Sequence, residues 1–163
     1  NSVYCGENIT SCTTISTATS AITKRMVTFA ADKTLTAADS GKWIYAADAT
    51  ALDLNLPAAS GNAGVTYEIF IQKAQTGNTH IMAQAGDYFE GALLISDADT
   101  ATENLFFAVA NTAEDDVINL DDDTKGRLAG GYMNFVCDGT NWHVQGHLVG
   151  DGTLATPFAD AES

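Results

Sequence analysis

The chain has 163 residues, 45% of them hydrophobic, which suits one domain with a substantial core and argues against a disordered polymer. Its 21 acidic residues outnumber its 7 Lys and Arg and give a formal net charge of −14. Such a surface repels the phosphates of nucleic acids and anionic membranes, whereas it favours solubility and suits a basic protein partner. No run of about 20 apolar residues predicts a membrane span, and no signal-peptide pattern is present. A start at Asn1 leaves open whether residues before it have been removed.

Residues 1–25 differ from the rest because Ser and Thr dominate and apolar residues are sparse. This segment cannot bury enough surface to fold alone, and its β-branched residues favour extended structure. It is interpreted as an extended arm that lies on a neighbouring subunit, with a flexible tail as the alternative. The residues expected to make assembly contacts are Val3, Tyr4, Ile9, Ile15 and Ile22.

Three cysteines are too few and too scattered for a disulfide framework. Cys5 and Cys12 are close enough in sequence to close a small loop, but the redox compartment that decides this is not readable from the chain. Cys137 alternates with apolar residues and is predicted to be a buried hydrophobe. Residues 8–10 fit the glycosylation sequon, a match too short to carry weight.

The segment from residue 26 to residue 149 is dominated by strands, because apolar and polar residues alternate with a period of two. The most regular part spans residues 52–95, where Tyr67, Ile69 and Ile71 share one predicted core face. Turn residues such as Gly77-Asn78 separate the strands, and residues 98–104 are the longest helix candidate. Further strands are predicted at residues 27–31, 43–45, 105–109 and 117–120. We therefore expect a single antiparallel β-sandwich or barrel of about eight to ten strands. Residues 150–163 are expected to be an irregular tail.

The last hairpin is the clearest element of the pattern. Residues 138–141 read Asp-Gly-Thr-Asn, a four-residue turn between two alternating segments. Folding about this turn sets Cys137 opposite Trp142 and Phe135 opposite Val144. All four side chains then point to the same face, so the register is consistent with one buried face.

Acidic clusters are the first candidates for metal binding. Asp121, Asp123 and Gly126 match part of a calcium loop, but Lys125 occupies a ligand position and Tyr132 replaces the closing Glu. Solvated loops between strands are the favoured interpretation, so no metal is predicted. A second, looser set of oxygen ligands is Asp97, Asp99 and Glu103.

No catalytic constellation is recognisable. His143 and His147 fall on one strand face about 13 Å apart, too far to share one zinc ion, and His80 lies in another strand. The glycines form no nucleophile elbow, Walker loop or dinucleotide fingerprint. We therefore predict no catalytic, cofactor-binding or metal residues and no enzymatic activity. A glycosidase-type carboxylate pair stays open, because such pairs are not recognisable from sequence.

Four aromatic residues invite comparison with a sugar-binding face: Trp43, Tyr67, Tyr88 and Trp142. Aromatic residues on strands are more often part of the core. Because Trp142 is in phase with Val144, core placement is favoured for it.

Several short motifs occur in a recognisable order along the chain. They are LTAADSGK at residues 35–42, LNLPAA at 54–59, Gly64, YEIFI at 67–71, Gly86-Asp87, Gly91 and DGTNW at 138–142. In this order the chain resembles small β-rich virion proteins of tailed bacteriophages, especially capsid decoration (cement) proteins and modules of phage fibres. The resemblance covers residues 33–148. It implies a non-enzymatic protein that binds the outside of a capsid shell, often as a trimer at local symmetry axes. The arm is not part of the resemblance.

The expected function is therefore structural: self-assembly, with binding and reinforcement of a phage capsid from the outside. The expected partners are copies of the chain, with a trimer favoured, and the major capsid protein or another lattice protein. No nucleic acid, membrane or cofactor is expected. One alternative is a subunit of an extracellular filament, in which the arm completes a neighbour's sheet. Another alternative is a carbohydrate-binding β-sandwich module.

Overall fold

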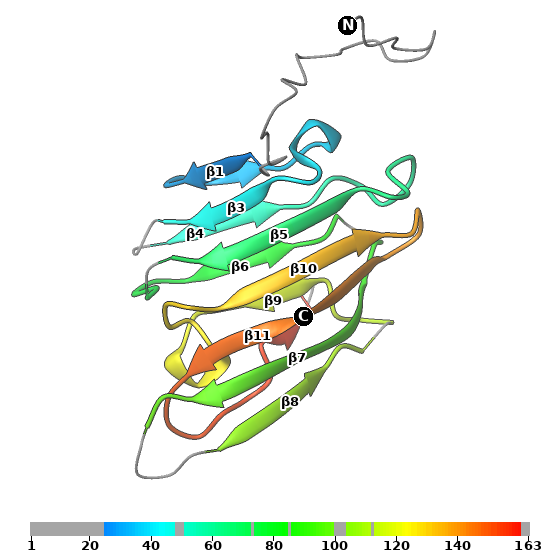
Figure 1. The fold of residues 1–163 in the computed structure, drawn as a ribbon. Coiled ribbons are helices and arrows are strands. Elements are labelled where there is room, and N and C mark those ends of the chain that lie inside the picture. The colour runs from blue at the N-terminus through cyan, green and yellow to red at the C-terminus, as the bar shows by residue number, and fades with distance from the viewer. Residues whose placement is uncertain are drawn as a thin grey trace, which may run out of the picture.

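A computed structural model describes residues 25–47, 51–72, 74–84, 86–99, 104–111 and 113–160. These residues form two sheets packed face to face, so the predicted all-β sandwich is confirmed (Figure 1). In spatial order the larger sheet contains β1 (Met26–Phe29), β3 (Trp43–Ala46), β5 (Thr66–Ile71), β10 (Tyr132–Cys137), β11 (Trp142–Gly150), β7 (Phe89–Asp97) and β8 (Leu105–Val109). The smaller sheet contains β12 (Phe158–Ala159), β9 (Val117–Asn119), β6 (Thr79–Met82), β4 (Leu52–Asn55) and β2 (Lys33–Thr34). Two short 3-10 helices are η1 (Ala37–Asp39) and η2 (Asp123–Lys125).

The sheets are mixed, which corrects the expectation of an antiparallel sandwich. The first six strands alternate between the two sheets, so β1, β3 and β5 are parallel neighbours, as are β2, β4 and β6. Strands β7 and β11 are also parallel. The cause is that the chain crosses to the opposite sheet before returning, and local alternation carries no information on strand direction. Twelve strands occur in the described residues; β2 and β12, two residues each, are too short to show a period.

The core lies between the sheets and is built from the inward residues of the alternating strands. Tyr67, Ile69, Phe135, Val144 and Trp142 are all buried, as predicted. The Trp142 ring stacks on Tyr67 with 5.5 Å between ring centroids. Its indole N–H donates to the Pro57 carbonyl at 3.2 Å, which ties β11 to the segment that follows β4 in the other sheet.

The predicted register of the last hairpin is confirmed. Cys137 pairs with Trp142 and Phe135 with Val144 across β10 and β11. The turn is held by Asp138, whose Oδ1 accepts from the backbone N–H groups of residues 140 and 141 at 2.7 and 2.8 Å. A carboxylate that accepts from the two following amides is the usual way in which Asp stabilises a tight turn.

The C-terminal segment differs from expectation, because it is not wholly irregular. Strand β12 pairs antiparallel with β9, and Phe158 is buried in the core. The arm at residues 1–24, with Cys5, Cys12 and the five predicted assembly residues, lies outside the described residues. The helix candidate at 98–104 falls mostly outside them as well. No helix in the described part of the chain is long and apolar enough to cross a membrane.

Candidate functional site

The partial calcium loop at residues 121–126 is organised by ion pairs. Asp123 Oδ1 accepts from the Arg127 side chain at 2.6 Å, and Lys125 Nζ lies 3.1 Å from Asp121 Oδ1. Asp122 caps η2 by accepting from the backbone N–H of Thr124. The carboxylates are thus engaged within the chain. No group of three or more His, Cys, Asp and Glu among the described residues is arranged to hold a metal ion.

The three histidines occupy separate places, each beside an oxygen. His80 Nδ1 lies 2.8 Å from Asp53 Oδ1 on the smaller sheet. His143 lies between Asp138 and Glu90, with nitrogen–oxygen distances of 3.1 and 3.6 Å. The pKa of Asp138 is lowered to about 2, chiefly by the backbone hydrogen bonds from residues 141 and 140 and further by His143.

Ser96 and His147 form a pair that the sequence did not reveal, because 51 residues separate them. Ser96 Oγ lies 2.7 Å from His147 Nε2, the geometry of a nucleophile and its base. However, Ser96 sits within β7, between β11 and β8, where backbone N–H groups are used in the sheet ladders. Among the described residues, no pair of free amides is therefore preorganised beside Ser96 for an oxyanion, and the pair carries no catalytic assignment.

One row of side chains crosses the outer face of the larger sheet from β3 to β8. Its members lie directly opposite one another on successive strands: Tyr45, Phe70, Tyr132, His147, Leu94 and Phe107. The first three rings are in mutual contact, with centroid distances of 5.0 Å for Tyr45–Phe70 and 4.8 Å for Phe70–Tyr132. Cross-strand pairs of this kind stabilise a sheet, and here they form a continuous aromatic stretch across β3, β5 and β10.

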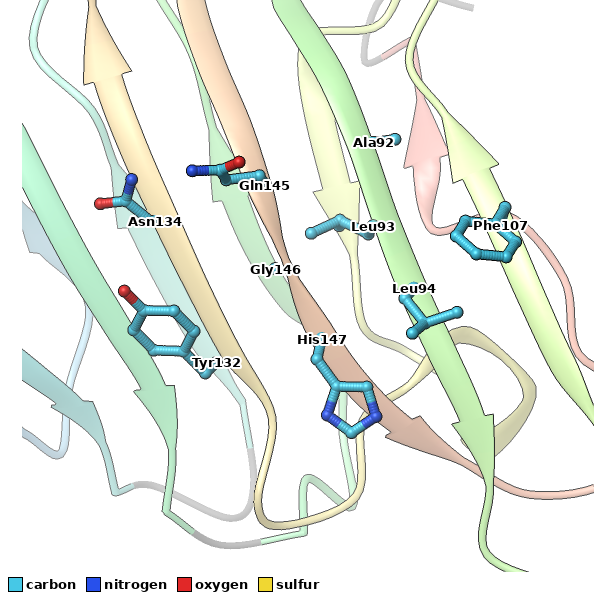
Figure 2. A pocket seen from close by; sticks show the side chains of 9 residues that line it. All are labelled: Ala92, Leu93, Leu94, Phe107, Tyr132, Asn134, Gln145, Gly146 and His147. Atoms are coloured by element: carbon cyan, nitrogen blue, oxygen red, sulfur yellow. The ribbon is translucent and has the colours of Figure 1, made fainter.

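A shallow groove lies beside this row, over β11, and Gly146 is among the residues that line it. A Cβ at this position would lie 2.2 Å from the Tyr132 carbonyl oxygen, so β10 and β11 approach closely only because glycine is present. The groove has a volume of about 480 Å³ (Figure 2). The Tyr132 ring, the His147 ring and the amides of Asn134 and Gln145 border it. A second hollow continues from it past Glu90 and His143.

The edge strand β8 is the most unusual surface of the molecule. Leu105, Phe107 and Val109 are 65, 69 and 71% exposed, while the alternate residues Phe106 and Ala108 face inward. In the described part of the chain β8 pairs only with β7, and it contains neither a charge nor a proline. Edge strands are normally blunted by charges, prolines or a covering segment. The sequence predicted this strand but not its position at an edge.

The aromatic residues considered for sugar binding do not share one face. Tyr67 and Trp142 are in the core, whereas Trp43 lies on the outer face of β3, 38% exposed, with its ring 5.8 Å from that of Phe70. Comparison of the chain with family models, with curated proteins and with solved structures finds no match. The site must therefore be interpreted from its own geometry.

Proposed function

We propose that the protein is a structural virion protein that assembles with its own copies and binds and reinforces the outside of a phage capsid. The observation that carries the proposal is the exposed apolar edge at β8. Three large apolar side chains in a row on an edge strand, which in the described part of the chain pairs on one side only, mark a protein–protein contact, because a strand of this kind is an aggregation hazard unless another chain covers it.

The charge distribution supports assembly that depends on a specific partner. A net charge of −14 keeps free copies apart and soluble, while the uncharged edge offers one place for close contact. The expected partners are copies of the chain, with a trimer favoured, and the major capsid protein or another lattice protein. The resemblance of residues 33–148 to capsid decoration proteins points in the same direction and supports a position on the capsid exterior.

The test is to locate and then displace the chain on its native particle. Electron cryomicroscopy with antibody labelling is expected to find it on the outside of the shell, and particles stripped of it should open at lower temperature. Phe107→Asp should fail to rebind stripped particles, whereas Ser60→Asp, which adds the same charge on an exposed turn, should rebind normally. Location inside the shell or in a tail, or normal rebinding by Phe107→Asp, would contradict the proposal.

A second candidate function, carbohydrate binding, is favoured by the groove over Gly146. An aromatic ring beside amide groups is a common way to hold a sugar, through stacking and hydrogen bonds to hydroxyls. The ring here is that of Tyr132, and the amides are those of Asn134 and Gln145. Binding of the purified chain to a glycan array, lost in Tyr132→Ala and retained in Leu105→Asp, a change on the exposed edge outside the groove, would favour this function over the capsid role.

A further inference from the structure

We propose that β8 of one copy receives residues 13–17 from the N-terminal arm of a second copy as an added strand. The inference deepens the proposed function and rests on it, because it names the partner segment that covers the apolar edge during self-assembly. It is built from four features of the chain: the backbone of β8, its side chains, the composition of the arm and the place where the arm begins.

The backbone of β8 is ready to accept a strand. Two hydrogen bonds at the ends of β8 show which of its residues bond to β7. Asp97 N–H donates to the Asn104 carbonyl, and Ala110 N–H donates to the Gly91 carbonyl. In an antiparallel ladder the residues that exchange such bonds alternate along the strand, so residues 104, 106, 108 and 110 face β7. The N–H and C=O groups of residues 105, 107 and 109 therefore point away from the sheet, where an incoming strand would satisfy them.

The same three residues carry the exposed apolar side chains, so backbone and side-chain contacts would form together. The centre is Phe107, with Leu105 and Val109 on either side on the same face. A strand laid beside them needs apolar or β-branched residues with a period of two, because β-branched side chains pair well with aromatic ones across strands.

The arm contains a segment of this kind that is centred on a large apolar residue. Residues 13–17 read Thr-Thr-Ile-Ser-Thr, which places Thr13, Ile15 and Thr17 on one face with Ile15 at the centre. Residues 8–23 contain no charge, in a chain whose net charge is −14. This uncharged part of the arm can lie against an uncharged edge without desolvating an ion. Lys24 and Arg25 then follow at the base of the arm, where they suit the acidic surface of a neighbour.

The starting point of the arm favours a second copy over the same chain. The arm joins the body at Arg25, beside β1, and β1 and β8 are the two opposite edges of the larger sheet (Figure 1). Six strand spacings of about 4.8 Å separate them, about 29 Å in all. The ten residues from Ile15 to Arg25 span at most about 35 Å when fully extended. Within one chain they would have to run nearly taut across the outer face, whereas a head-to-tail neighbour brings its β1 edge next to β8.

Such a contact is heterologous, because the donor and acceptor surfaces differ. A heterologous contact closes into a ring when the rotation between neighbours is a whole fraction of a turn, and otherwise grows into a filament. A three-membered ring would match the favoured trimer, and an open chain would match the filament alternative. The strand addition is the same in both cases.

The experiment measures the mass of the full chain in solution, without capsids, by sedimentation velocity and light scattering. Phe107→Asp removes the acceptor, Ile15→Asp removes the donor, and Ser60→Asp is the control for added charge. The wild type and the control are expected to form a defined oligomer or filament. Each of the other two variants should assemble more weakly, with a dissociation constant raised about tenfold or more. Circular dichroism and melting temperature verify that the variants are folded, since Phe107 is exposed and residues 1–24 precede the sandwich.

Mixing the two defective variants gives the decisive result. The Ile15→Asp copy retains an intact β8 and the Phe107→Asp copy an intact arm, so an equimolar mixture should form a one-to-one dimer and nothing larger. In a background of Cys5→Ser and Cys12→Ser, Ile15→Cys on one copy should form a disulfide with Phe107→Cys on the other. No dimer in the mixture, or a crosslink only within one chain carrying both cysteines, would overturn the inference.

Two other outcomes would also overturn it, and each points to a different occupant of β8. If Phe107→Asp dissociates the oligomer but Ile15→Asp does not, β8 pairs with β8 of a second copy. If the wild type is monomeric in solution yet binds stripped particles, the capsid protein covers β8, and the proposed function stands without this inference. Conversely, complementation in the mixture with no binding to any particle would support the strand addition and contradict the capsid role.

Discussion

Replacement of Trp142 by alanine tests the architecture most directly, because this side chain joins the two sheets. The ring is fully buried, stacks on Tyr67 and donates to the Pro57 carbonyl. Deletion of a buried Trp side chain costs about 3–5 kcal/mol through lost transfer energy and the cavity left behind. The orphaned carbonyl of Pro57 adds about 1 kcal/mol. The expected loss of about 4–6 kcal/mol is most of the stability of an ordinary domain.

Two further variants separate the contributions. Trp142→Phe keeps an aromatic ring in the core and removes the indole donor, so it should cost about 1–2 kcal/mol. Trp43→Ala is the matched control, because the chain has two tryptophans and Trp43 lies partly exposed on the outer face, where its ring packs edge-on against Phe70. Its cost should be clearly smaller than that of Trp142→Ala, because removing a partly exposed surface side chain leaves no enclosed cavity.

Urea unfolding followed by circular dichroism gives these free energies. The slope of the unfolding free energy against urea concentration should be the same for each variant, because it depends on the surface exposed on unfolding. In a Trp43→Phe background, Trp142 is the sole indole and should emit at short wavelength until the protein unfolds. The reasoning would be refuted by a cost of Trp142→Ala no larger than that of Trp43→Ala. Emission typical of a water-exposed indole in the folded state would refute it equally.

Three other predictions concern single positions. Gly146→Ala should lower stability by about 1–3 kcal/mol, because the added Cβ meets the Tyr132 carbonyl at 2.2 Å; an unchanged melting temperature would mean that β10 and β11 lie farther apart. The pKa of Asp138 is depressed to about 2, so its contribution to stability is complete above the unfolded value of about 3.9 and is lost as the pH falls through 2. Asp138→Ala should therefore flatten the pH dependence of the melting temperature in that window, and an unchanged profile would contradict the turn geometry. Cys137 is buried, and burial raises the pKa of its thiol, so in a Cys5→Ser, Cys12→Ser background a thiol reagent should label it only on unfolding; rapid labelling of the folded protein would place it at the surface.

Local pattern was sufficient for the features that depend on neighbours in sequence. Strand faces, the buried side of β5 and the register of β10 against β11 all follow from a period of two and a short turn. The hairpin could be predicted pair by pair because its two strands are adjacent along the chain, so the turn alone sets which residues face each other.

What the sequence by itself determined was therefore the class of fold, the core-facing residues of the longer strands and one hairpin. Only the tertiary structure decided which strands became neighbours, that half of the pairings in the described part of the chain are parallel, and that the uncharged strand β8 ends the larger sheet there. It also brought Ser96 next to His147, and it paired Tyr132 with Phe70 on β5, a strand far from β10 in the sequence. The physical reason is that alternation of apolar and polar residues specifies only which side of a strand is buried. The order of the strands depends on which arrangement of the whole chain, crossing between the two sheets, buries the most apolar surface. No local segment contains that information.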